Sequence, residues 1–125
     1  GTIFATIADK DKEEALPLIR RFYNMGFNIE ATAGTAAFLK EHGIRTRVKK
    51  KISEGSEEIL DSIRQGYVTY VINTRNLDAS GTTSDGFQIR QCATENNVSI
   101  FTSLDTLKVL LDVLEEQTIC ISTIN

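Results

Sequence analysis

The hydrophobic and polar positions follow two alternating patterns along the chain. Short runs rich in apolar and β-branched residues are separated by longer segments in which apolar residues recur every three or four positions. The short runs are typical of strands and the longer segments of amphipathic helices. Strands are therefore predicted at residues 2–8, 27–31, 44–48, 67–73 and 98–101. Helices are predicted at residues 11–25, 34–43, 56–66, 86–96 and 103–117, and the tail at 118–125 as a last strand or a surface segment.

Capping residues support several of these helix boundaries. Ser56 and Ser103 precede helical patterns, where a hydroxyl can accept a free amide hydrogen of the first turn. Gly26 and Gly43 follow helical patterns and suit the left-handed conformation that commonly ends a helix. Pro17 removes one helical hydrogen bond, but it lies early enough in its helix to be tolerated.

The order of these elements indicates an α/β fold. Strands and helices alternate, and the connections between them are mostly short. Such a chain forms a mainly parallel sheet with helices on both faces. We therefore predict a three-layer αβα architecture around a central, mainly parallel five-stranded sheet. Because no linker, repeat or low-complexity segment divides the chain, residues 1–125 are predicted to form a single domain.

Composition limits the partners that this chain can have. The net charge of −3 argues against nucleic acid as the main ligand, despite the basic run "RTRVKKK" at 45–51. No apolar run approaches the roughly 20 residues that span a bilayer, so no membrane partner is expected. Cys92 and Cys120 stand in apolar contexts without metal-ligand spacing, which favours buried thiols, no bound metal and a reducing, cytoplasmic location. The chain does not begin with methionine and is expected to be part of a longer protein.

Polar residues gather where the predicted strands end. Parallel strands place their carboxyl ends on one edge of the sheet, and ligands of such folds bind at that edge. The residues that follow the strands include cations, hydroxyls, a glycine and an amide: Lys12, Thr32, Gly34, Thr35, Lys51, Asn73, Thr74 and Arg75. Lysines and threonines suit phosphate oxygens, and a helix that begins after Thr32 would point free N–H groups at the same edge. The sequence therefore predicts an anion site.

Two of these features also have purely structural interpretations. The "TAGT" stretch at 32–35 could be only a tight strand-to-helix turn capped by Thr32. The basic run at 45–51 could be only the solvated face of a strand. The sequence contains neither of the common glycine-rich phosphate-binding motifs. The prediction of an anion site therefore depends on several weak signals that converge on one edge of the sheet.

Four sequence blocks resemble a known family. They are "DKEEALPLIRRFYNMGFNIEATAGTAAFLKEHGI" from Asp11, "VKKKISEG" from Val48, "YVINT" from Tyr70 and "DGFQIRQCATENNVSIFTSLDT" from Asp85. Together they resemble the C-terminal regulatory domain of the bacterial carbamoyl phosphate synthetase large subunit, which has the methylglyoxal-synthase-like fold. The resemblance implies a non-catalytic domain, without a cofactor, that binds nucleotide effectors such as uridine or inosine monophosphate (UMP or IMP). The parent enzyme is a ligase that uses ATP with Mg or Mn to supply pyrimidine and arginine biosynthesis.

The resemblance also implies roles for individual residues. The phosphate ligands of the family correspond to Lys12, Thr32, Thr35, Lys51 and Asn73. Arg75 replaces a threonine that is common in the family, so it could bind phosphate itself or leave that contact to Thr74. Thr102 corresponds to a region near the family's ornithine site and is a candidate for activator binding or an interface. The implied partners are the other domains of the large subunit and the glutaminase small subunit, and a homo-oligomer could form.

A methylglyoxal synthase-type lyase acting on dihydroxyacetone phosphate is the enzymatic alternative. The synthase carries a catalytic aspartate in a "GGDQ" stretch, where this chain reads "KISEGSEE" from Lys51. It also has Asp-Pro where this chain has Asn73 and Thr74. The single histidine, His42, is predicted at the end of a helix, at the edge of the sheet opposite to the anion site. We therefore expect no catalytic residue in this domain.

Overall fold

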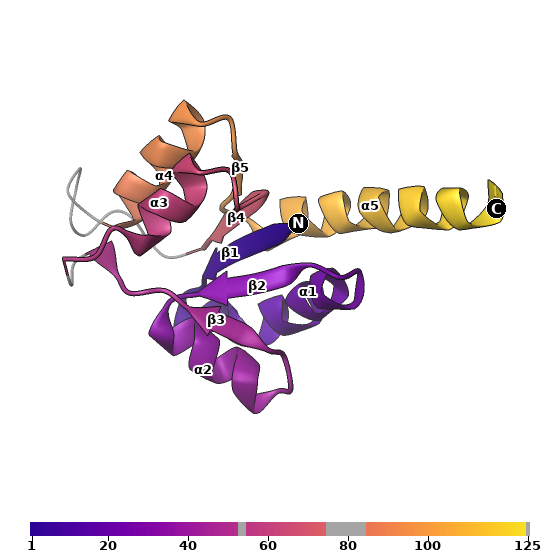
Figure 1. The fold of residues 1–125 in the computed structure, drawn as a ribbon. Helices are drawn as coiled ribbons and strands as arrows, with labels where there is room; N and C mark the ends of the chain where they lie inside the picture. The colour runs from indigo at the N-terminus through magenta and orange to yellow at the C-terminus, as the bar shows by residue number, and fades with distance from the viewer. Residues whose placement is uncertain (53–54, 75–84, 125) are drawn as a thin grey trace.

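Strands and helices alternate along the chain in the computed structural model, which describes residues 1–52, 55–74 and 85–124. At 85–86 and 118–124 only the backbone is described. The elements are shown in Figure 1. They are β1 (Thr2–Thr6), a short 3-10 helix η1 (Asp9–Asp11), α1 (Lys12–Asn24), β2 (Asn28–Ala31), α2 (Ala33–Glu41), β3 (Thr46–Val48), α3 (Glu58–Arg64), β4 (Tyr70–Asn73), α4 (Asp85–Glu95), β5 (Ser99–Phe101) and α5 (Leu104–Ile124).

The five strands form one sheet in the order β3-β2-β1-β4-β5, and all of its strand pairs are parallel. The register aligns Ala5 of β1 with Ala31 of β2 and with Ile72 of β4, so these three strands end at the same edge. Helices α1, α2 and α5 cover one face of the sheet, and α3 and α4 cover the other (Figure 1). The predicted three-layer αβα architecture is therefore confirmed.

Alternation along the strands divides the buried side chains between two hydrophobic layers. Ile3 and Ala5 of β1 pack with α1, α2 and α5, whereas Phe4 between them packs with α3 and α4. The same alternation separates Ile72 from Val71 in β4. Successive strand residues point to opposite faces, and both faces are covered, so neighbouring residues of β1 and β4 are buried in different layers.

Apart from the end of α5, the predicted helix boundaries lie within two residues of the observed ones. The Ser56 hydroxyl accepts the amide hydrogen of Glu58 at 3.2 Å, and the Ser103 hydroxyl accepts that of Asp105 at 3.2 Å. Gly26 has a φ of +95° directly after α1, which is the left-handed conformation expected there. Pro17 lies within α1 on its exposed side, and the helix continues through it as predicted.

The tail is a correction to the predicted elements. Residues 118–124 continue α5 as a helix and form neither a strand nor an irregular surface segment. No glycine or proline interrupts the sequence from Leu104 to Ile124, so nothing in it ends the helix near residue 117. Figure 1 shows that the C-terminal part of α5 extends beyond the rest of the molecule. Among the described residues, none of the helices combines the length and apolar character needed to span a bilayer.

Candidate functional site

A cavity of about 400 Å³ opens at the carboxyl ends of β1 and β2, beside the first turn of α2. Its lining consists of Ile7, Ala8, Asp9, Lys12, Thr32, Gly34, Thr35 and Lys51. Five of the residues predicted for the anion site, from three separate segments of the chain, therefore border one cavity. We call it the α2 cavity.

The N-terminus of α2 reaches the cavity without a side-chain cap. Thr32 occupies the N-cap position with φ −70° and ψ 163°, but its hydroxyl makes no capping hydrogen bond. That hydroxyl instead lies 3.5 Å from the hydroxyl of Thr6. The first amide hydrogens of a helix have no acceptor within the helix, and they carry partial positive charge. Thr32 therefore occupies the N-cap position that the turn interpretation of "TAGT" predicted, but its side chain does not cap the helix, and the helix end can receive an anion.

Thr35 connects α2 to the end of β1. Its buried hydroxyl accepts the amide hydrogen of Ile7 at 3.1 Å. A hydroxyl that accepts a hydrogen bond still has its own hydrogen to donate. Thr35 can therefore hold the loop after β1 in place and donate to a ligand oxygen in the same cavity.

Gly34 keeps the space between the helix end and Lys12 open. A Cβ atom at this position would lie 3.8 Å from Nζ of Lys12, which is an ordinary van der Waals distance. The glycine is therefore not required by the packing of the fold. Its absent side chain leaves room in front of the helix amides, where an oxyanion could approach both them and the lysine.

Lys12 is held in the cavity by Asp9, a carboxylate that was not among the predicted site residues. Its ammonium pairs with Asp9, and its side chain is 18% exposed whereas that of Asp9 is 92% exposed. Asp9 and Lys12 lie three residues apart, across the turn from η1 into α1. This spacing is the feature of the sequence from which the ion pair could have been predicted. An incoming phosphate would compete with Asp9 for the lysine.

Asn73 and Thr74, which were predicted as site residues at the end of β4, do not line the cavity. Asn73 is 1% exposed and is aligned with Thr6 in the register of β1 and β4. The Thr74 hydroxyl accepts the amide hydrogen of Ala8 at 3.1 Å, which secures the loop that borders the cavity. The predicted direct contact of these residues with phosphate would need a ligand that extends past this loop. Arg75 lies outside the described residues.

Thr102 is not brought to the cavity. It is exposed and follows β5, which is separated from β1 by β4. It shares the carboxyl edge of the sheet with the cavity but borders none of it. Any role of Thr102 in activator binding or at an interface would therefore belong to a separate surface.

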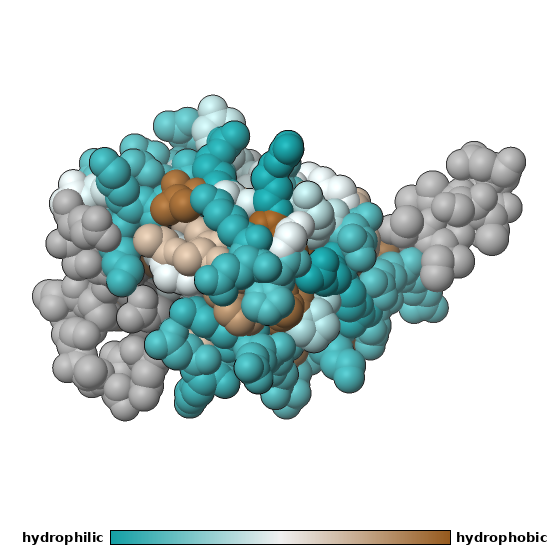
Figure 2. All heavy atoms as spheres, turned by 90° about the horizontal axis from the view of Figure 1, so that it is seen from below, coloured by the Kyte–Doolittle hydropathy of each residue, from teal (hydrophilic) through white to brown (hydrophobic). Residues whose placement is uncertain are grey.

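The basic run at 45–51 is divided among different surroundings. Lys51 lines the α2 cavity, whereas Lys49 approaches the carboxylate of Glu30. Arg45, Arg47 and Lys50 are exposed, and the molecule seen from below in Figure 2 is largely hydrophilic. The interpretation as a solvated strand face is therefore correct for part of the run, and the functional interpretation concerns Lys51.

His42 lies where the sequence predicted it. It is the C-cap residue of α2, and its Nδ1 is 2.9 Å from the carbonyl oxygen of Phe38. Helix α2 has nine residues and begins at the cavity, so His42 lies at its opposite end, roughly 13 Å away along the axis at 1.5 Å per residue. The histidine cannot exchange protons with a ligand in the α2 cavity.

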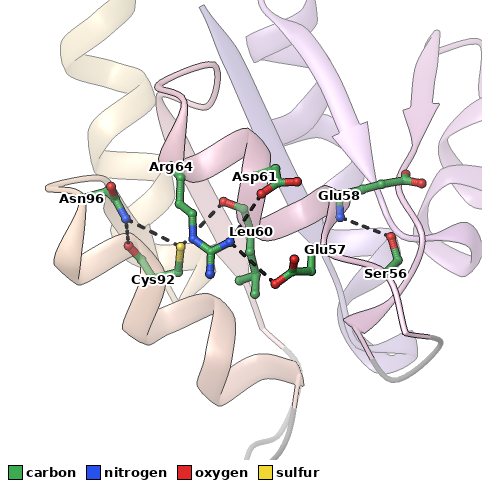
Figure 3. Close-up of polar contacts among 8 residues, drawn as sticks. All are labelled: Ser56, Glu57, Glu58, Leu60, Asp61, Arg64, Cys92 and Asn96. Atoms are coloured by element: carbon green, nitrogen blue, oxygen red, sulfur yellow. Dashed lines mark hydrogen bonds and ion pairs between the residues drawn. The ribbon is translucent and has the colours of Figure 1, made fainter.

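Cys92 lines a cavity of about 470 Å³ between α3 and α4, but its environment does not favour a reactive thiol. Cys92 is 6% exposed and lies beside Leu60 and Asn96, near the Arg64 side chain (Figure 3). Burial raises the pKa of the Cys92 thiol, so the thiolate that would react or bind metal is disfavoured. Cys92 is thus the buried thiol that the sequence predicted, and the side chain of Cys120 lies outside the described residues. The described residues contain no group of three side chains suited to a metal ion.

Fold and site together define a small parallel αβα domain with an anion-type cavity at the carboxyl edge of its sheet. A family model described as the MGS-like domain matches residues 14–102, which is most of the chain. The chain therefore belongs to the MGS-like domain family. It is similar to a solved structure described as methylglyoxal synthase from Elizabethkingia anophelis NUHP1, with a TM-score of 0.70 and 20% sequence identity. The likeness covers 88% of this chain and 76% of that one, and at this identity it supports the fold alone.

Proposed function

We propose that this chain is the effector-binding regulatory domain of a carbamoyl phosphate synthetase large subunit, and that it recognises the phosphate of a nucleoside monophosphate such as UMP or IMP. The observation that carries the proposal is the convergence of Lys12, Lys51 and an uncapped helix N-terminus on one cavity. The volume of about 400 Å³ falls in the range of small-ligand pockets, about 300–1,000 Å³.

The phosphate would lie at the first turn of α2. Helix amides and the Thr35 hydroxyl would donate to its oxygens, while Lys12 and Lys51 neutralise its charge. Hydrogen bonds to charged groups contribute about 1.5–3 kcal/mol each. A few of them, less the cost of immobilising the ligand, support affinity in the micromolar range, about −8 kcal/mol.

The described lining of the α2 cavity favours binding over chemistry. Its one carboxylate, Asp9, is paired with Lys12. An elimination from dihydroxyacetone phosphate needs a general base and an electrophilic partner within hydrogen-bond reach of the substrate. His42, at the far end of α2, cannot supply the second group. The lyase is therefore the alternative outcome of the test below.

Regulation would act by shifting the equilibrium between two conformational states of the parent enzyme. An effector that binds one state of the parent enzyme more tightly moves the equilibrium towards that state. The partners in this proposal are the other domains of the large subunit and, through them, the glutaminase small subunit. The parent would use ATP with Mg or Mn in the cytoplasm, and this domain itself would carry no cofactor.

Calorimetric titration of the chain with UMP and IMP tests the proposal, with uridine as the ligand that lacks phosphate. We expect at least one nucleotide to bind and uridine not to bind. Lys51→Ala should weaken the binding at least about tenfold, whereas Lys50→Ala, which removes an exposed neighbouring cation, should leave it within about twofold. The absence of nucleotide binding at millimolar concentration would contradict the proposal. Release of methylglyoxal from dihydroxyacetone phosphate would favour the lyase instead.

A further inference from the structure

A third cavity, of about 390 Å³, lies on the face of the sheet that carries α3. It is bordered by Glu30 of β2, Arg47 of β3 and Tyr67, together with residues of α3. The register aligns Glu30 with Phe4 on one side and with Arg47 on the other, which places all three on the same face. This Glu30 cavity shares no lining residue with the α2 cavity.

Glu30 is buried without full compensation of its charge. Its side chain is 7% exposed, and Oε1 has no hydrogen-bond partner in the described part of the chain. The Nζ atom of Lys49 lies 3.9 Å from Oε2, which is too long for a hydrogen bond. A buried carboxylate is costly unless it is paired and hydrogen-bonded. A donor that entered the cavity would supply the missing interaction.

The charges around the cavity favour a single positive charge on the ligand. The lining contains three carboxylates, from Glu30, Glu58 and Asp61, and two cations, from Arg47 and Lys49, which leaves one net negative charge. Lys49 lies 3.9 Å from Glu30 and offsets part of its charge, so the cavity suits a ligand with one positive charge better than a divalent metal ion. The described residues also lack a cluster of three metal-binding side chains. These features together favour an organic cation.

Tyr67 adds an aromatic surface to the same cavity. It is 63% exposed, although it is a large aromatic residue, and it borders the cavity together with Gln65. Aromatic faces attract ammonium and guanidinium groups and also pack against short apolar stems. Tyr67 would therefore contact the part of a ligand that does not reach Glu30.

We propose that the Glu30 cavity binds a small organic monocation, with a primary ammonium or guanidinium head and a short apolar stem. The head donates hydrogen bonds to the Glu30 carboxylate, and the stem lies against Tyr67. The site is separate from the phosphate site, so the proposal does not depend on nucleotide binding. It assigns a role to a buried carboxylate that the fold does not fully satisfy.

Titration with n-butylammonium and n-butylguanidinium chlorides, followed by amide chemical shifts and calorimetry at constant ionic strength, tests the proposal and distinguishes the two heads. The neutral analogue n-butanol is the matched ligand control. We expect at least one cation to bind, to perturb the amides of Arg47, Gln65 and Tyr67, and to leave that of Gly34 unchanged. Comparable shifts with n-butanol would show a non-specific apolar contact and would overturn the proposal.

Glu30→Gln removes the charge while it keeps the shape of the side chain. It should weaken binding at least about tenfold, as expected for loss of a charge-assisted hydrogen bond. Glu57→Gln makes the same change on a carboxylate that is 70% exposed and outside the cavity, and it should leave affinity within about twofold. Unchanged affinity in Glu30→Gln, or no binding of either cation to the unmodified chain at about 10 mM, would refute the proposal. The shift map gives an independent answer if the variant is poorly folded.

Discussion

At the scale of single residues, the α2 cavity combines a polar residue that the fold requires with a small residue that packing does not demand. Thr35 is required by the fold, because its hydroxyl accepts the amide hydrogen of Ile7. Gly34 is not required by the fold, because an added Cβ would meet Nζ of Lys12 only at 3.8 Å. The sequence singled out both positions by residue type and spacing. Only the structure separates the one that supports the loop from the one that leaves space for a ligand.

Gly34→Ala is expected to change stability and binding in opposite directions. Alanine in place of glycine in a helix favours folding by up to about 1 kcal/mol. The new methyl group would occupy the space in front of the helix amides and Lys12, so nucleotide affinity should fall severalfold. Urea unfolding and calorimetry on the same sample measure the two effects.

Ala37→Gly, at an exposed position of the same helix and outside the cavity, is the matched control. It should cost up to about 1 kcal/mol and leave affinity unchanged. If Gly34→Ala stabilised the chain without weakening nucleotide binding, the glycine would be only part of a turn.

At the scale of elements, the sequence pattern predicted the type and approximate ends of each helix and strand, apart from the end of α5. It did not predict which strands are neighbours in the sheet. Serine and glycine caps gave helix boundaries within a few residues because their hydrogen bonds are local. The order β3-β2-β1-β4-β5 depends on contacts between segments far apart in sequence, which no local pattern contains. Glu30 therefore resembled an ordinary strand residue, although the completed sheet buries it beside Lys49.

The packing of α5 on α1 includes a long-range ion-pair network that could not be predicted from the sequence either. Arg21 of α1 contacts Asp112 at 2.7 Å, and both carboxylate oxygens of Glu115, at 2.5 and 3.0 Å. The hydrogen bonds from Arg21 hold the pKa of Glu115 below its ordinary value of 4.5. The carboxylate pair in turn raises the already high pKa of Arg21, so the guanidinium stays charged.

We predict that the stabilising effect of Arg21 disappears in acid. The pKa of Glu115 is lower in the folded than in the unfolded chain, so its contribution is present above pH 4.5 and is lost as the pH falls through the folded pKa. Arg21→Met should therefore unfold at lower urea than the unmodified chain at pH 7, and the difference should shrink below pH 4.5.

Arg45→Met, at an exposed position, is the control and should show a small effect without this pH dependence. A difference for Arg21→Met that stayed constant down to pH 3 would show that the apolar part of the arginine side chain, and not its ion pairs, stabilises the packing of α5.

At the scale of the whole molecule, one sheet connects two hydrophobic layers. The alternation of Ile3, Phe4 and Ala5 sends neighbouring side chains of β1 into different layers, so neither layer can lose β1 without disturbing the other. This arrangement explains why the alternating strands and helices were sufficient to predict the architecture. The α2 cavity lies at the carboxyl edge of this sheet, and the Glu30 cavity lies on the face that carries α3.

The shared sheet predicts that the chain unfolds as one cooperative unit. Leu111→Ala in the layer of α1, α2 and α5, and Ile63→Ala in the layer of α3 and α4, each remove a fully buried side chain and should cost about 2–5 kcal/mol. Val109→Ala, at a residue that is 62% exposed, should change stability by about 0.5 kcal/mol or less. Far-UV circular dichroism reports the helices, and the reactivity of Cys92 in a Cys120→Ser background reports the layer of α3 and α4. Because β1 contributes to both layers, the two probes should give the same unfolding midpoint in every variant.

The contrary outcome would be an unfolding midpoint for Cys92 that moved with Ile63→Ala while the midpoint for the helices stayed in place. It would show two independently folding layers, and residues 1–125 would then not behave as a single domain.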